Sequence, residues 1–381
     1  DTHTHASLAH SHAPRAACHS PPPQHSLPQS VPEAMASRIL LPALLLLLLC
    51  AHCGGAAGRR ARGGGEASSQ VKFDFSPFLI EYKSGVVKRL MGTDRVSAAA
   101  DPLTGVTSRD VTIDPAAGVD ARIYLPSLRA TTKVPVLVYF HGGAFVVESA
   151  FNPIYHAYLN TLAAKAGVVA VSVNYRLAPE HPLPAAYDDS WAALKWVLAN
   201  AAPGADQWLS QYGDLSRLFL AGDSAGGNIA HNLALRAGEE GLDGGARLKG
   251  VALLDPYFQG RSAVGAYSAD PSFLQSAART WSFICAGKYP IDHPYANPLM
   301  LPTASWQHLG ASRVLVTVSG QDRLSPWQRA YYSTLRTSGW PGQAELYETP
   351  GEGHVYFLTK MSTPQAQAEM ATLVAFINRD A

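Results

Sequence analysis

The period of the hydrophobic positions changes repeatedly along the chain, and the changes predict strands that alternate with helices. Val134–Phe140 and residues 167–175 are nearly continuous apolar runs of strand length, which is typical of strands buried on both faces of a sheet. Between them, Pro153–Ala166 has apolar residues at helical spacing. The alternation continues to the C-terminus, with strands predicted at 217–221, 251–254, 314–318 and 344–347, and helices at 185–198, 226–237, 327–338 and 364–378.

This order predicts one α/β domain with a mostly parallel central sheet and helices on both of its faces. Residues 111–113 and 121–125 alternate in polarity around a glycine-containing turn, so an antiparallel hairpin is expected before the first buried strand. Segments 71–95 and 257–307 break the rhythm, and we expect them to form a cap over a pocket, with packed surface excursions as the alternative. Ligands of such sheets bind at the carboxyl ends of the strands, so the chemistry is expected in the loops that follow strands.

The first 70 residues have a different pattern and are predicted to lie outside the domain at 71–381. Residues 1–34 hold six of the fourteen histidines and have no helix or strand period, which indicates an unstructured extension upstream of a start at Met35. Residues 35–57 contain Arg38, an apolar run and then small residues, the layout of a secretory signal peptide. Residues 58–70, rich in glycine and arginine, are predicted to be a linker. We therefore expect a destination in the secretory pathway (the ER or the cell exterior), with the cytoplasm as the alternative.

Composition narrows the class of protein. Of 381 residues, 47% are hydrophobic and the net charge is +1, which excludes a disordered chain and argues against a nucleic-acid partner. Four cysteines exclude a disulfide-dense scaffold. The apolar run within 35–57 is too short to span a bilayer, so no stable membrane span is expected in the mature domain. The sequence has no cysteine–histidine metal spacing, G-x-G-x-x-G or P-loop, so no metal or redox cofactor is expected.

Residues 222–226, Gly-Asp-Ser-Ala-Gly, follow one predicted strand and open a helix. In this strand–turn–helix context, G-x-S-x-G is typical of a nucleophile elbow. Small flanking residues let the chain turn sharply, so that the Ser224 hydroxyl stands clear of the strand end. The Ala225 N–H then lies at a helix N-terminus, where it can donate to a developing oxyanion.

A second loop, His141-Gly142-Gly143-Ala144, follows the strand Val134–Phe140. Acyl transfer needs backbone donors aimed at a carbonyl oxygen, and glycines permit the close approach that this requires. We expect Gly142 and Gly143 to supply oxyanion-hole N–H groups together with Ala225. A simple turn is the alternative.

A serine needs a base, and in this fold the acid and then the histidine follow it along the chain. Asp322 follows the strand predicted at 314–318, and His354 follows the last predicted strand, so both should reach the same rim of the sheet as Ser224. We predict His354 as the general base and Asp322 as the residue that orients it. Rival acids and histidines, which fit less well, are Asp255, Glu352, His231, His293 and His308.

The chain resembles the hormone-sensitive-lipase-like branch of the α/β-hydrolases, and plant carboxylesterases in particular. The resemblance is carried by residues 139–145 (YFHGGAF), 174–182 (NYRLAPEHP), 222–228 (GDSAGGN) and 353–354 (GH), and it runs from about residue 71 to the C-terminus. It implies the α/β-hydrolase fold, with Arg176 and Glu180 as scaffold charges. One departure is Ala144, where many relatives carry glycine.

The same branch includes gibberellin receptors, which lack the triad histidine that His354 supplies here. It also includes hydroxyisoflavanone dehydratases, which have an altered oxyanion loop, whereas Gly142 and Gly143 keep the esterase form. The sequence therefore predicts a serine carboxylester hydrolase that acts on small or medium apolar esters through an acyl-enzyme on Ser224. The alternatives are a lyase or dehydratase acting on a plant metabolite, with His354 as its base, and a non-catalytic small-molecule receptor. The expected partner is a small-molecule ester, and the oligomeric state stays open.

Overall fold

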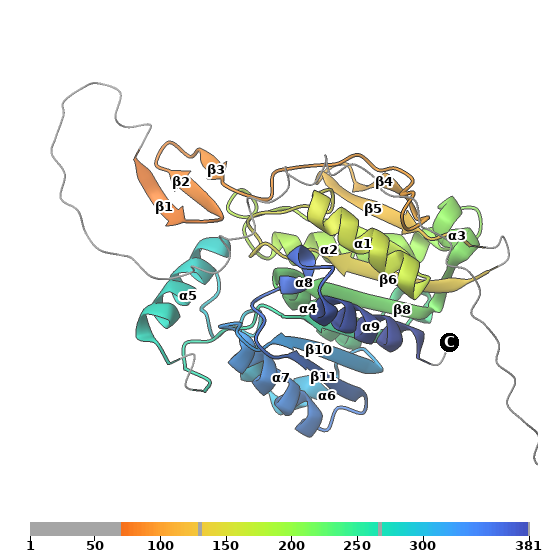
Figure 1. The fold of residues 1–381 in the computed structure, drawn as a ribbon. Helices are drawn as coiled ribbons and strands as arrows, with labels where there is room; N and C mark the ends of the chain where they lie inside the picture. The colour runs from red at the N-terminus through yellow and green to blue at the C-terminus, as the bar shows by residue number, and fades with distance from the viewer. Residues whose placement is uncertain (1–69, 129–131, 266–268, 380–381) are drawn as a thin grey trace, which may run out of the picture. The chain divides into compact units, whose positions relative to one another are not determined.

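The computed structural model describes residues 70–128, 132–265 and 269–379, and the interpretations of residues 1–34, 35–57 and 58–69 lie outside them. An eight-stranded sheet has the order β11-β10-β9-β8-β6-β7-β5-β4 (Figure 1). Its strands are β4 (Thr107–Asp114), β5 (Val119–Leu125), β6 (Val134–Phe140), β7 (Val169–Asn174), β8 (Gly213–Asp223), β9 (Leu248–Leu254), β10 (Arg313–Ser319) and β11 (Gln343–Thr349). From β7 to β11 the neighbours pair in parallel, while β5 pairs antiparallel with β4 and β7. The predicted mostly parallel sheet and its hairpin are confirmed.

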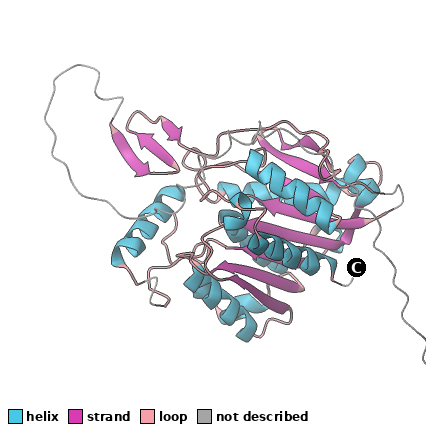
Figure 2. Ribbon diagram, viewed as in Figure 1, coloured by secondary structure: helices cyan, strands magenta, loops and turns pink. Residues whose placement is uncertain are grey.

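Helices cover both faces of this sheet, as the ribbon coloured by secondary structure shows (Figure 2). They are α1 (Pro153–Ala166), α2 (Ala185–Asn200), α3 (Gln207–Tyr212), α4 (Ala225–Glu240), α5 (Pro271–Ile284), α6 (Thr303–Gln307), α7 (Ser325–Thr337), α8 (Tyr356–Thr359) and α9 (Pro364–Asn378). None of the helices in these described ranges combines the length and the apolar character needed to cross a membrane.

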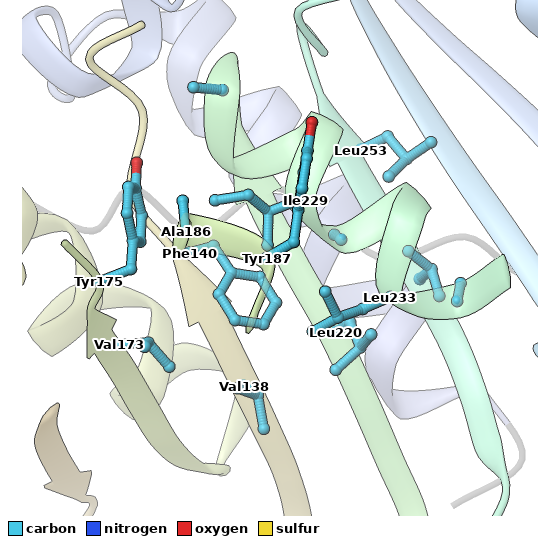
Figure 3. Packing of buried hydrophobic residues seen from close by; sticks show 14 of the residues in the cluster. Val138, Phe140, Val173, Tyr175, Ala186, Tyr187, Leu220, Ile229, Leu233 and Leu253 are labelled. Carbon is cyan, nitrogen blue, oxygen red and sulfur yellow. The ribbon is translucent and has the colours of Figure 1, made fainter. Parts of the chain in front are cut away.

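The two faces of the sheet build two buried clusters because side chains alternate along each strand. In β6, Val138 and Phe140 pack with residues of α2 and α4, whereas Leu137 and Tyr139 pack with residues of α1 and α9. Figure 3 shows the first cluster, in which Phe140 lies among side chains from neighbouring strands and helices. Continuous apolar runs are therefore required, since each strand must bury both of its faces.

The parallel pairing brings the loops that carry the predicted chemistry to one edge of the sheet. β6 ends at Phe140, β8 at Asp223, β10 at Ser319 and β11 at Thr349, and the carboxyl ends of parallel neighbours lie together. The glycine loop, the elbow and the segments with Asp322 and His354 all begin there.

Residues at the start of the described chain form a three-stranded antiparallel sheet of β1 (Val71–Phe75), β2 (Leu79–Tyr82) and β3 (Val87–Arg89). The Phe73 ring stacks on Phe283 of α5, with the ring centroids 4.1 Å apart. Arg89 donates to the Val146 carbonyl at 2.7 Å and pairs with Glu180 at 2.7 Å. The two segments that broke the α/β rhythm therefore contact each other and the loop after β6.

The sequence analysis did not predict the strands β1–β3 or the helices α3, α5, α6 and α8, and it placed the start of β8 too late. β8 begins at Gly213 rather than at residue 217, because Gly213 and Asp214 pair with Val134 and Pro135 before an irregularity in the register. Helix α5 was not predicted, although its start carries a recognisable signal. Asp270 caps it by accepting the Ser272 N–H at 2.9 Å, and a proline stands in its first turn.

Candidate active site

Ser224 lies at a sharp turn between β8 and α4. Its φ of 52° and ψ of −116° are strained for a residue with a side chain. The turn needs glycine at positions 222 and 226, because both residues pass so close to other backbone atoms that there is no room for a side chain. A Cβ on Gly226 would overlap the Phe140 carbonyl, and a Cβ on Gly222 would overlap the backbone of Gly226. The Ser224 N–H donates to the Leu254 carbonyl at 2.9 Å, which fixes the turn against β9.

The structure brings Ser224, His354 and Asp322 together in one line of contacts. Nε2 of His354 lies 2.8 Å from the Ser224 Oγ, and Nδ1 lies 2.7 Å from Oδ2 of Asp322. In the tautomer with its proton on Nδ1, the imidazole donates to Asp322 and can accept the serine proton at Nε2. Three segments far apart in the sequence therefore meet in one row of hydrogen-bonded side chains.

Asp322 is buried and held by two further donors. Its Oδ1 accepts the Leu324 N–H at 2.9 Å, and its Oδ2 accepts from Nε2 of Gln328 at 2.9 Å. The sequence analysis did not identify Gln328, a polar residue on the buried side of α7. Its amide keeps the Asp322 oxygen that faces His354 in place.

The rival residues have other partners. Asp255 also ends a strand, but its carboxylate accepts from Ser319 and from the Val355 N–H. Glu352 pairs with Lys360 at 2.6 Å. Of the rival histidines, His231 contacts the Tyr331 hydroxyl at 3.0 Å and His293 accepts the Tyr295 N–H at 3.2 Å.

The glycine loop differs from expectation at one donor. We predicted that the Gly142 N–H would be an oxyanion-hole donor. Instead, it donates a hydrogen bond to the Tyr155 hydroxyl at 2.9 Å. The N–H groups of Gly143, Ala144 and Ala225 have no hydrogen-bond partner within the described ranges. The physical reason is Tyr155, which reaches the loop from α1 and occupies the first amide. Within the described ranges, the loop residues with an unoccupied N–H are therefore Gly143 and Ala144, rather than the predicted Gly142 and Gly143.

Buried charge surrounds the serine. Asp223 is fully buried; burial raises its pKa to about 6 although Tyr155 and Tyr139 each donate to it at 2.9 Å. Burial lowers the pKa of His354, but the negative charges of Asp322, Asp255 and Asp223 together outweigh burial and raise this pKa. The surrounding carboxylates therefore favour the protonated form of His354.

Asp255, Asp322 and His354 also meet the spacing of metal ligands in the described part of the chain, with ligand atoms within 4.8 Å of one another. Their contacts suit a proton better than an ion. Nδ1 of His354 and Oδ2 of Asp322 face each other at 2.7 Å, and both carboxylate oxygens of Asp255 already accept hydrogen bonds.

The sheet topology and the serine at the elbow define the class of α/β-hydrolases. A family model described as "alpha/beta hydrolase fold" matches residues 137–358, and the chain belongs to this family. The expectation of a hydrolase acting on ester bonds, related to plant carboxylesterases, is confirmed at the level of the family.

Curated relatives from plants align with 81% of the chain. Tuliposide A-converting enzyme 1, chloroplastic, of Tulipa gesneriana is 44% identical over 78% of its own length. Probable carboxylesterase 2 of Arabidopsis thaliana is 42% identical over 97% of its length, and 2-hydroxyisoflavanone dehydratase of Glycyrrhiza echinata is 41% identical over 97%. Among solved structures, the esterase LipW from Mycobacterium marinum is 29% identical, with a TM-score of 0.60, and the match covers 72% of this chain and 82% of that chain.

The predicted destination in the secretory pathway is wrong. The tulip relative is named as a chloroplast protein, which contradicts the interpretation of residues 35–57 as a secretory signal. An apolar run followed by small residues is one part of a targeting signal, and by its hydrophobicity alone it does not determine which membrane the segment addresses.

Proposed function

We propose that the chain is a serine carboxylesterase that forms an acyl-enzyme on Ser224. The observation that carries this proposal is the contact of Ser224 Oγ with His354 Nε2 at 2.8 Å, backed by the contact of His354 with Asp322. His354 removes the hydroxyl proton as Ser224 attacks the ester carbonyl, and then gives that proton to the leaving alcohol. In the second half of the reaction, His354 removes a proton from water as the water attacks the acyl-enzyme. It then returns that proton to the Ser224 oxygen, and the carboxylic acid product leaves.

The oxyanion is proposed to bind the N–H groups of Gly143, Ala144 and Ala225. Their support is that these three amides have no hydrogen-bond partner in the described part of the chain, whereas the Gly142 N–H donates to the Tyr155 hydroxyl. Donors that are fixed before the reaction stabilise the developing charge without reorganising. Gly142 then contributes to the shape of the loop.

The proposed substrates are small or medium esters with apolar groups. The support is that the backbone beside Ser224 contacts an aromatic cluster: the Tyr257 N–H donates to the Ser224 carbonyl at 2.8 Å, and the rings of Phe145 and Trp281 lie 6.2 and 6.3 Å from the Tyr257 ring. Such surroundings favour apolar acyl or alkyl groups. The sheet β1–β3 and helix α5 are proposed to cap this region, on the support of the Phe73–Phe283 stack.

The test compares the full chain with its Ser224→Ala variant on a short-chain nitrophenyl ester. Ser224→Ala should lose at least about 1,000-fold in kcat/KM, because its hydroxyl is the nucleophile. Ser190→Ala, which replaces another buried serine, is the matched control and should retain activity. A fluorophosphonate should phosphonylate the serine oxygen with loss of HF, and so add its mass less that of HF to the wild type and to Ser190→Ala but not to Ser224→Ala. Equal activity of Ser224→Ala and wild type would overturn the proposal.

The dehydratase relative supports a second candidate, an elimination in which His354 acts as the base. Analysis of the products by mass spectrometry separates the two reactions, since hydrolysis adds water to the substrate and dehydration removes it. Retained elimination by Ser224→Ala together with loss in His354→Gln would favour the second candidate.

A further inference from the structure

We propose that Asp255 is a positioning residue of this site, which fixes the backbone beside both His354 and Asp322 and places a second carboxylate next to the imidazole. Its role in turnover rests on the proposed esterase function. Asp255 follows β9, is fully buried, and was a rival candidate for the acid that orients the histidine. The structure gives it a different set of contacts, which reach both partners of the His354–Asp322 pair.

The carboxylate of Asp255 ties two loops together. Oδ1 accepts the Ser319 N–H at 2.7 Å, and Oδ2 accepts the Ser319 hydroxyl at 2.6 Å. Oδ2 also accepts the Val355 N–H at 2.8 Å. Ser319 ends β10, and its carbonyl accepts the Asp322 N–H at 3.0 Å, so this contact holds the start of the Asp322 turn. Val355 directly follows His354, so the second contact holds the base.

The backbone at these contacts is strained. Val355 has φ 48° and ψ 31°, the left-handed region that a β-branched residue rarely adopts, and Asp255 itself has φ 43°. Such conformations persist where surrounding contacts determine them, and they occur at functional sites. The hydrogen bond from Val355 to Asp255 is such a contact, and through the adjoining peptide it sets the direction from which His354 approaches Ser224.

The charge of Asp255 acts on the same histidine. The ionisable groups that face His354 are Asp322, Asp255 and Asp223, and all three favour the protonated imidazole. Asp255 in turn faces Asp322, His354 and, from α9, the buried Glu369. Burial and then the Asp322 charge raise the pKa of Asp255 to about 6, so it is ionised at neutral pH. The hydrogen bonds of Asp255 to Ser319 and Val355 hold the backbone, whereas its charge is expected to act on the titration of His354.

The experiment follows the low-field Nδ1 proton of His354 by NMR against pH in the full chain, with the signal identified by its loss in His354→Gln. In Asp255→Asn, which removes the charge and keeps an oxygen acceptor, the His354 midpoint should fall by about 1 pH unit. The acid limb of kcat/KM should move with it, and kcat should fall by about tenfold while KM stays within about twofold. Asp189→Asn, which removes a buried carboxylate that pairs with Arg176 instead, should leave the midpoint unchanged.

An unchanged His354 midpoint in folded Asp255→Asn would overturn the proposal. If that variant does not fold, Ser319→Ala replaces it, since it removes one donor from the carboxylate and leaves the charge. The wild-type signal should show a smaller inflection near pH 6 as Asp255 protonates, and Ser319→Ala should move it to higher pH; an inflection that stays in place contradicts the role of Asp255. The NMR readout needs no turnover, so failure of the esterase proposal, seen with Ser224→Ala, remains distinguishable.

Discussion

The hydroxyl of Tyr155 accepts the Gly142 N–H at 2.9 Å and at the same time donates to Oδ2 of Asp223 at 2.9 Å. One side chain of α1 therefore connects the glycine loop to the residue that precedes Ser224. Tyr139 donates to the other oxygen of Asp223 at 2.9 Å, and no hydrogen bond joins its hydroxyl to the glycine loop among the described residues. The two tyrosines form a matched pair, since each supplies one hydrogen bond to the same buried carboxylate.

Tyr155→Phe should lower kcat by about 10- to 100-fold, because loss of the hydroxyl releases the loop that carries the proposed oxyanion donors. KM for a short ester should change much less. Tyr139→Phe removes the equivalent bond to Asp223 and leaves the loop fixed, so its kcat should fall far less. Steady-state kinetics on the two variants, with unfolding measured in parallel, checks this. Equal losses in both variants would show that the ionisation of Asp223, not the position of the loop, controls the rate.

Gly226→Ala should destabilise the fold by about 3 kcal/mol, because the new methyl group meets the Phe140 carbonyl in a packed core. Gly353→Ala is the control: this glycine adjoins His354, but a Cβ there meets no atom within 4 Å and its φ is not positive. Urea unfolding of the two variants compares them. We expect near wild-type stability for Gly353→Ala, and a destabilised Gly353→Ala beside a stable Gly226→Ala would refute the packing argument.

The buried His231 should make the protein less stable in acid. Burial lowers its pKa from 6.5 to about 3, so between these values the unfolded chain binds a proton that the folded chain does not. Its contribution to stability is complete above pH 6.5 and is lost as the pH falls toward 3. His231→Phe keeps a ring beside Phe258 and Tyr331 but cannot titrate.

Between pH 7 and pH 5, the free energy of unfolding of the wild type should fall by about 2 kcal/mol more than that of His231→Phe. Urea titrations at both pH values measure the difference. Other acids and histidines titrate in both proteins and cancel in the comparison. Parallel losses in the two proteins would exclude His231 as the source.

Much of the fold could be predicted because strand burial leaves a direct trace in the sequence. Val134–Phe140 is apolar at every position because both of its faces are covered, and its predicted bounds equal the observed ones. β8 was predicted too short, since Gly213 and Asp214 pair with β6 while lacking an apolar pattern. Helix α5 was missed in the segment 257–307, which was expected to form part of a cap, although Asp270 and Pro271 carry the signal of a helix start.

Part of the candidate site could also be predicted from the sequence, and part of it could not. Chain order placed Ser224, Asp322 and His354 after strands of one parallel sheet, and this placed them on one rim without knowledge of any contact. The preference for Asp322 over Asp255 followed from strand order, and the structure places Asp322 against the imidazole. No local signal could indicate that Tyr155 takes the Gly142 amide, because α1 and the loop meet only through tertiary packing.

The sequence by itself determined the sheet and the elements that carry the chemistry, because hydrophobic period and turn residues act over a few neighbouring positions. Only the tertiary structure decided that Tyr155 accepts the Gly142 N–H of the glycine loop, and that Asp255 binds Ser319 and Val355 beside the His354–Asp322 pair. These contacts are directional hydrogen bonds between segments that lie far apart in the chain. They arise only when packing brings one donor and one acceptor within about 3 Å of each other.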